Sequence, residues 1–166
     1  MNPVMRVIFT DFDGVLNSGA WSSESIKGIG LEDKIRDPES EARWILEPAR
    51  IALLNEAVTR TQAKVVVSSA WRGDGYGIEM LRFAGLLEDA IGETPHGRLD
   101  LGLPSTLTVA MRPLEIRAWL QQHPEVESFV AIDDEALRME HLVRTQGLYG
   151  LLQADVDEVV RRLGPV

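Results

Sequence analysis

Three apolar runs, spread along the chain, limit the possible folds more than any other feature of the sequence. They lie at residues 4–10, 64–69 and 128–134, have the length of a strand and are rich in β-branched residues. Because apolar residues run through them without alternating, we expect strands that are buried on both faces. Segments with helical spacing separate them. This alternation predicts the α/β class, with a Rossmann-like parallel sheet and helices on both faces.

The same patterns predict further elements. Apolar residues at helical spacing mark helices that begin at Pro48, cover 78–87, begin at Pro113 and cover 155–163. Shorter apolar segments mark possible strands at 90–94 and 148–152. In the last helix, Asp155 and Glu158 have the spacing of a capping box.

The polar segment 18–47 interrupts this pattern. It is punctuated by glycine, and we expect an inserted loop with a little local structure that lies over the end of the first strand as a minimal cap. A chain of 166 residues is long enough for one sizeable core. We therefore expect a single domain over 1–166 that carries this cap-like insertion.

Composition excludes several classes of protein. Hydrophobic residues make up 45% and charged residues 26%, which is ordinary for a globular domain. We find no apolar run of membrane-spanning length and no signal pattern, so we expect a cytoplasmic protein with no membrane partner. The absence of cysteine excludes disulfides and thiolate zinc sites.

The net charge is −9, so the overall field does not attract nucleic acid. A polynucleotide substrate would need a local basic rim, and the sequence has no dense block of Lys and Arg. The nearest is Arg161-Arg162, which we interpret as the solvated face of the last helix.

Each of the three main strands ends in polar side chains. These are Asp11 and Asp13, Ser68 and Ser69, and Asp133 and Asp134. Ligands of parallel sheets bind beyond the carboxyl ends of the strands, so neighbouring strands would bring these groups into one cleft. Carboxylates at this spacing repel each other unless a cation or a proton lies between them. Four of them form a hard, oxygen-rich site that favours Mg²⁺.

Such a site suits phosphoryl transfer. An aspartate beside Mg²⁺ can attack phosphorus, and a second one two residues on can move the proton of the leaving oxygen and of the attacking water. Ser68 offers a hydroxyl to the phosphoryl oxygens. Arg112 is the candidate cation, because it lies four residues before Ile116 on the same helical face and near the helix start. Arg117 is turned away from that face and is the weaker candidate.

The segments "DFDGVLN", "VVVSSAW", "RPLEIRAWL" and "VAIDD" resemble, in this order, the four motifs of the haloacid dehalogenase (HAD) superfamily of phosphotransferases. The resemblance implies that Asp11 is the nucleophile and Asp13 the general acid/base. It also implies that Asp11, Asp13, Asp133 and Asp134 hold Mg²⁺ as the cofactor. The expected reaction is hydrolysis of a phosphomonoester through an aspartyl-phosphate.

In this resemblance Ser68, Ser69 and Arg112 bind the phosphate. The family usually has lysine where this chain has Arg112, and arginine keeps the charge without the compact ammonium group. The Ser-Ser-Ala-Trp-Arg segment and the third motif are most similar to the small HAD domains of Swiss Army Knife RNA repair-like proteins. The expected partner is therefore a phosphorylated small molecule or the phosphate end of a nucleic acid.

Other interpretations stay open. A receiver-like phospho-acceptor module uses similar residues, but its acidic pair comes at the first strand, whereas here the adjacent pair comes late. A catalytically silent HAD-like binding domain is the other alternative. Arg72 and Trp71 are candidate substrate contacts; Arg72 could equally be a surface residue, and the tryptophans at 21, 44 and 71 could stack a base or simply pack. The three histidines receive no role.

Overall fold

A five-stranded parallel sheet lies at the centre of the protein. Its computed structural model describes residues 4–21 and 37–166. The strands, in spatial order, are β3 (Gly92–Glu93), β2 (Lys64–Val67), β1 (Met5–Thr10), β4 (Val126–Asp133) and β5 (Leu142–Arg144). β1 is central, and its last residue, Thr10, pairs with Val67 of β2 and Ile132 of β4. The carboxyl ends of these strands therefore meet at one edge.

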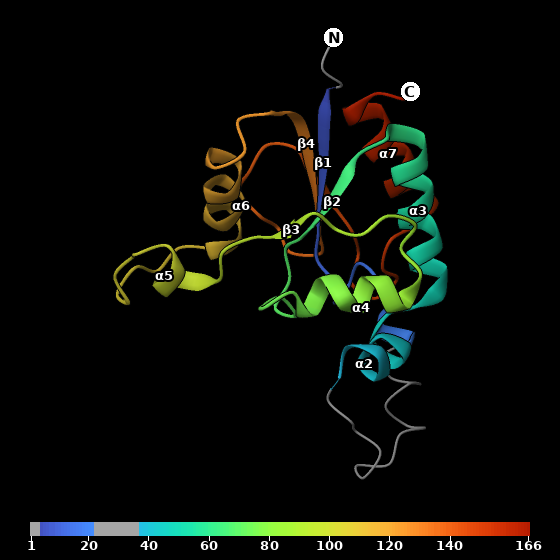
Figure 1. Ribbon diagram of the computed structural model, residues 1–166, viewed down its shortest axis with the longest axis horizontal. Helices are drawn as coiled ribbons and strands as arrows, with labels where there is room; N and C mark the ends of the chain where they lie inside the picture. The colour runs from blue at the N-terminus through green and yellow to red at the C-terminus, as the bar shows by residue number, and fades with distance from the viewer. Residues whose placement is uncertain (1–3, 22–36) are drawn as a thin grey trace.

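Helices cover both faces of the sheet, as the alternating pattern predicts. They are α2 (Pro38–Ile45), α3 (Pro48–Thr61), α4 (Tyr76–Ala84), α5 (Gly97–Asp100), α6 (Met111–Gln121) and α7 (Gln153–Leu163). α3, α4 and α7 contribute to the core on one face, and α6 covers the other. Figure 1 shows α6 on one side of the sheet and α3 and α7 on the opposite side, with α4 and α2 near the carboxyl ends of the strands.

The core explains why β1 is apolar throughout. Successive residues of a strand point to opposite faces, and both faces of β1 are buried. Ile8 belongs to the cluster with α3 and α7, whereas Val7 and Phe9 belong to the cluster with α6. The ring of Phe9 meets that of Trp119 edge-on, with 5.4 Å between centroids. The strand is thus held between two helical layers.

The last strand differs from the prediction. We expected it at 148–152, but β5 is Leu142–Arg144, and only its central residue is buried. Residues 146–150 instead form a tight turn, in which the amides of Tyr149 and Gly150 donate to the carbonyl of Gln146. A three-residue edge strand is too short to show a period, whereas the leucines around the turn resemble a strand pattern.

Two helix starts also differ. α7 begins at Gln153, so Asp155 lies inside the first turn and accepts from the amide of Leu152 at 2.8 Å. The predicted capping box of Asp155 and Glu158 is therefore wrong, because the box is shifted by three residues. Glu158 pairs instead with Arg161 and Arg162 at the surface.

The helix predicted from Pro113 begins two residues earlier, at Met111, which places Arg112 in its first turn. The helix predicted over 78–87 is α4, which begins at Tyr76 and ends at Ala84. The segment between β3 and α6, which lacks apolar periodicity, contains the single-turn α5.

The predicted insertion contains α2. The helix is capped by Asp37, whose side chain accepts from the amide of Ser40 at 2.9 Å, and its residue Glu41 bonds to Tyr76 of α4. Part of the predicted insertion, residues 22–36, lies outside the described residues. None of the helices in the described part of the chain is long and apolar enough to cross a membrane.

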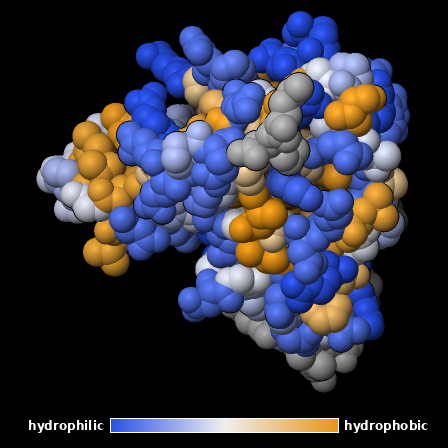
Figure 2. Space-filling model, turned by 45° about the horizontal axis from the view of Figure 1, so that its top comes forward, coloured by the Kyte–Doolittle hydropathy of each residue, from blue (hydrophilic) through white to orange (hydrophobic). Residues whose placement is uncertain are grey.

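The surface in Figure 2 is mostly hydrophilic, with separate apolar patches. One patch covers the projecting end of the molecule around α5, where the side chain of Leu99 is 91% exposed. This projection lies beside the start of α6.

Candidate active site

Three aspartates converge at the carboxyl edge of the sheet. Asp11 follows β1, Asp133 ends β4 and Asp134 comes next. Carboxylate oxygens of the three residues all lie within 4.8 Å of one another. The amide of Asp11 donates to the carbonyl of Ile132 at 3.0 Å, which continues the ladder between the two strands and aligns their ends. The predicted convergence of these acids is confirmed.

Close packing of the backbone places Asp134. Gly14 has φ +77°, and a Cβ added there would come within 2.3 Å of Oδ2 of Asp134. A Cβ at Gly147 would come within 2.8 Å of the same oxygen. Thr145 donates from Oγ1 to the carbonyl of Gly14 at 2.7 Å and ties the two loops together. Glycine is needed at both positions because a side chain would displace the carboxylate.

The burial of Asp11 destabilises the ionised form of its carboxyl group. Burial raises its pKa from the ordinary 3.8 to about 7; Arg112 lowers that pKa and Asp133 raises it further. Oδ1 of Asp11 accepts from the amide of Phe12 at 2.8 Å. Burial also raises the pKa of Asp133, whose Oδ1 accepts from the amide of Glu135 at 3.0 Å. The geometry favours a bound cation between these carboxylates.

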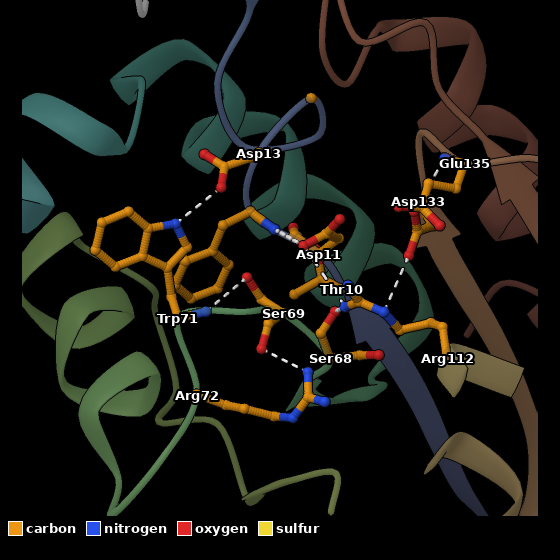
Figure 3. Close-up of polar contacts among 12 residues, drawn as sticks. Thr10, Asp11, Asp13, Ser68, Ser69, Trp71, Arg72, Arg112, Asp133 and Glu135 are labelled. Atoms are coloured by element: carbon orange, nitrogen blue, oxygen red, sulfur yellow. Dashed lines mark hydrogen bonds and ion pairs between the residues drawn. The ribbon is translucent and has the colours of Figure 1, made fainter. Parts of the chain in front are cut away.

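Arg112 provides the nearest positive charge. Its Nη1 lies 3.6 Å from Oδ1 of Asp11, and its Nε lies 3.7 Å from Oδ2 of Asp133. Nη1 also donates to the carbonyl of Ser68 (Figure 3). Arg117 is exposed and outside this group, as its position on the helix predicts. The structure therefore brings Arg112, and not Arg117, to the acids.

The two serines that follow β2 differ. Ser68 is 2% exposed, and among the residues that the structure describes its Oγ has no hydrogen-bond partner. The hydroxyl of Ser69 bonds to Asp11 and accepts from the amide of Trp71 at 3.3 Å. Ser68 thus has a buried hydroxyl available to a ligand, whereas the hydroxyl of Ser69 orients Asp11.

Asp13 lies apart from the other acids. Its Oδ2 accepts from Nε1 of Trp71 at 2.9 Å (Figure 3). Its Oδ1 accepts from Nδ2 of Asn17 at 3.1 Å. The carboxylate of Asp13 is not part of the cluster formed by Asp11, Asp133 and Asp134. Two donors therefore orient it at the rim of the site, and its predicted roles as general acid and metal ligand stay predictions.

Arg72 is buried in an ion pair with a residue of α6. Its side chain is 3% exposed, so it is not an ordinary surface residue, and its contact with a substrate stays a prediction. Its Nη1 donates to the carbonyl of Ser69 at 2.6 Å, and its Nη2 lies 2.7 Å from Oε2 of Glu115. The local sequence does not show this, because the partner lies on α6, far along the chain.

Trp71 stands between the site and a neighbouring cavity. Trp71 and Trp44 line this cavity of about 490 Å³ together with Glu41 and Tyr76. Trp21 donates from Nε1 to the carbonyl of Trp44 at 3.1 Å. The indole of Trp71 thus has a definite polar role toward Asp13, and base stacking by the tryptophans stays a prediction.

Comparison with known proteins assigns the family. A family profile described as the HAD domain in Swiss Army Knife RNA repair proteins matches residues 7–156. The chain belongs to this family. The HAD domain is thereby placed among phosphatase-type hydrolases, and the sheet and its helices agree with a HAD-like fold.

This HAD domain is similar to the HAD domain of the effector protein Lem4 from Legionella pneumophila, solved as an inactive mutant, with 17% sequence identity and a TM-score of 0.42. The similarity covers 97% of this chain and 79% of that chain. No curated protein matches the chain.

Three residues of this HAD site were missed by sequence reasoning. Asn17 and Glu115 lie within the quoted motifs, and Glu115 is three residues after Arg112, so helical spacing places it near the same face. Thr145 has no local signal, because its contact with Gly14 depends on the loop after β5.

Proposed function

We propose that this HAD domain is a Mg²⁺-dependent phosphomonoesterase that acts through an aspartyl-phosphate on Asp11. One observation carries the proposal: a largely buried carboxylate cluster, a cation and a hydroxyl without a partner among the described residues lie together at the carboxyl ends of β1, β2 and β4. Each of these groups has a use in phosphoryl transfer, and their combination is hard to explain by folding alone, because buried charges and free hydroxyls are costly.

The cation site has the ligands that Mg²⁺ prefers. Asp11, Asp133 and Asp134 offer only oxygen, and no soft ligand belongs to the group. Their mutual repulsion and the raised pKa of Asp11 support a cation there. When bound, the metal would neutralise phosphoryl charge and favour the ionised form of Asp11.

In the first step, an oxygen of Asp11 forms a bond to phosphorus while the bond from phosphorus to the leaving oxygen breaks. Asp13 gives its proton to that oxygen, and its two hydrogen-bond donors hold it for this task. Asp13 then takes a proton from water, whose oxygen attacks phosphorus. The bond between phosphorus and Asp11 breaks, which releases inorganic phosphate and restores the carboxylate.

Ser68 and Arg112 bind the phosphoryl oxygens in this proposal. The hydroxyl of Ser68 has no competing partner among the described residues, and the guanidinium of Arg112 already faces Asp11. Donors that are fixed before the reaction stabilise the charge of the transition state without reorganisation.

We propose phosphate ends of nucleotides or RNA as the substrate class. The description of the family, which names RNA repair proteins, supports this. The net charge of −9 favours a short substrate over a long polyanion, because no general positive field attracts the latter. A panel of nucleoside 3′- and 5′-monophosphates, 3′- and 5′-phosphorylated oligonucleotides and sugar phosphates would rank these candidates by kcat/KM.

The deciding experiment is hydrolysis of an aryl phosphate with Mg²⁺ and with excess EDTA. We expect turnover only with the metal, and no turnover by Asp11→Asn, which keeps the shape and the amide contact but removes the nucleophile. Trapping of a phosphorylated protein in the wild type alone would support the intermediate. Turnover in EDTA, or full activity of Asp11→Asn, would contradict the proposal.

Two alternatives give different results in the same experiment. A silent binding domain would bind inorganic phosphate with Mg²⁺ present but would hydrolyse none of the panel. A phospho-acceptor module would form a long-lived phosphorylated protein and release phosphate far more slowly than it is loaded.

A further inference from the structure

We propose that the buried ion pair of Arg72 and Glu115 is a positioning device, which holds α6 so that Arg112 meets the phosphate beside Ser68. The inference rests on the proposed function and adds two positioning residues to it. Neither residue touches the phosphate in this scheme, and both act through Arg112.

The pair connects two elements that are distant in the sequence. Arg72 follows β2, and its guanidinium donates to the carbonyl of Ser69 at 2.6 Å while it lies 2.7 Å from the carboxylate of Glu115 on α6. The side chains are 3% and 4% exposed, so water does not screen the pair. In the view of Figure 3, the guanidinium of Arg72 lies on the far side of Ser69 from Asp11.

A second link runs parallel to the first. Arg112, on the same helix and three residues before Glu115, donates to the carbonyl of Ser68. The segment after β2 is thus joined to α6 twice. Arg112 of α6 bonds directly to the carbonyl of Ser68. Arg72, which bonds to the carbonyl of Ser69, reaches α6 through its ion pair with Glu115. Because residues three apart lie on one side of a helix, both links set the distance between α6 and the end of β2.

The two links differ in what a phosphate would do to them. Arg112 would have to turn its donors from Ser68 toward phosphoryl oxygens, and this would loosen its own link. The link through Arg72 uses the carbonyl of Ser69 and the carboxylate of Glu115, neither of which binds phosphate in this scheme, so it would persist. It would keep the helix start in place while the Arg112 side chain is engaged, and the start of α6 has no side-chain cap to do so.

Glu115 has one more contact that supports this role. Its Oε1 accepts from the amide of Gly97 at 3.0 Å, so both carboxylate oxygens are used and the side chain has one defined rotamer. A buried ion pair is costly to desolvate and adds little net stability. The positioning of α6 therefore explains this pair better than a contribution to stability does.

The test is a double-mutant cycle between the pair and Arg112. Arg72→Met removes both bonds of the guanidinium; Glu115→Gln is milder, because it keeps the shape and the acceptor for Gly97. We expect each to lower kcat/KM for an aryl phosphate about tenfold in the wild-type background, and about twofold or less in the Arg112→Ala background. The same variants should bind inorganic phosphate more weakly, as measured by titration calorimetry.

Arg82→Met is the matched control. It also breaks an arginine–carboxylate bond of 2.8 Å, to Asp89, but at the surface and away from the site. Its kcat/KM should stay at the wild-type value. Melting temperatures of all variants separate a loss of folded protein from a loss of positioning.

The outcomes are distinct. If Arg72→Met and Glu115→Gln lose the same factor with and without Arg112, the pair is only structural and the inference fails while the phosphatase proposal stands. If either variant keeps full kcat/KM and phosphate affinity, the inference also fails alone. If the wild type neither hydrolyses the aryl phosphate nor binds inorganic phosphate, the proposed function fails and this inference fails with it.

Discussion

The carboxylate of Asp11 is buried and forms no close ion pair. The nearest nitrogen of Arg112 lies 3.6 Å from it. Burial accordingly raises its pKa to about 7. At the scale of the residue, this is a conflict between the charge that catalysis would need and the stability of the protein without a metal ion.

The conflict predicts a pH-dependent stability. A carboxyl whose pKa is raised in the folded state stabilises the fold below its unfolded value of 3.8, and this contribution is lost as the pH rises to about 7. Asp11→Asn cannot ionise, so it should melt several degrees above the wild type at pH 8, and the difference should shrink as the pH falls toward 4. Thermal denaturation in EDTA across this range is the measurement. A constant difference at every pH would contradict the assignment.

The hydroxyl of Ser68 is buried and has no hydrogen-bond partner among the described residues. Removing an unsatisfied buried group costs the fold little, whereas removing a donor to the transition state costs on the order of tenfold to a thousandfold in rate. Ser68→Ala should therefore keep or raise the melting temperature while kcat falls at least tenfold. Ser69→Ala, which loses the bond to Asp11, serves as the comparison. A Ser68→Ala variant with normal kcat would show that the hydroxyl has no ligand.

At the scale of the element, the turn after β1 is shaped by its neighbour. Gly14 leaves room for the carboxylate of Asp134, which lies where a Cβ would be. We expect Gly14→Ala to displace Asp134 and to raise the Mg²⁺ concentration for half-maximal activity about tenfold or more, since a displaced ligand weakens the metal site.

Gly85→Ala is the control for this turn. Gly85 also has positive φ, at +95°, but nothing lies within 4 Å of an added Cβ. Both variants should lose about 1 kcal/mol of stability from the backbone conformation. Only Gly14→Ala should change the Mg²⁺ requirement, and an equal change in both would mean that strain alone is responsible.

α6 presents two arginines to different surroundings. Arg112 faces the acids, and Arg117 is exposed. Arg112→Ala should lower kcat about a hundredfold, because a charge-assisted contact to the phosphoryl group is lost. Arg112→Lys should recover part of the rate, since it keeps the charge. Arg117→Ala should be fully active. Steady-state kinetics at saturating Mg²⁺ decide the matter, and an inactive Arg117→Ala would mean that the wrong arginine was assigned.

At the scale of the whole molecule, the charge of −9 acts on every substrate before it reaches the site. Its field extends over about 10 Å at 0.1 M salt and repels a polyanion more than a single phosphate. We therefore expect the KM of a 3′-phosphorylated oligonucleotide to fall when NaCl is raised from about 50 to about 300 mM, and that of a mononucleotide to change little. An oligonucleotide KM that rises with salt would reveal a local basic rim that outweighs the global charge.

Much of the architecture was predictable from local pattern. The three main strands were predicted within one or two residues, because burial on both faces produces continuous apolar runs of strand length. Parallel strands end at one edge, so the meeting of Asp11 with Asp133 and Asp134 followed from topology. Helical spacing and the position at the helix start separated Arg112 from Arg117.

The sequence by itself thus determined the main strands of the sheet, its reactive edge and the cation on α6. Short stretches of sequence are enough for this, because their apolar pattern and periodicity show which residues are buried. The tertiary structure alone decided which side chains turn toward each other. It paired Arg72 with Glu115, bound Trp71 to Asp13, seated Asp134 beside Gly14 and formed β5 where no pattern marks a strand. Each of these contacts joins residues from separate elements, and their geometry exists only once the sheet brings those elements together.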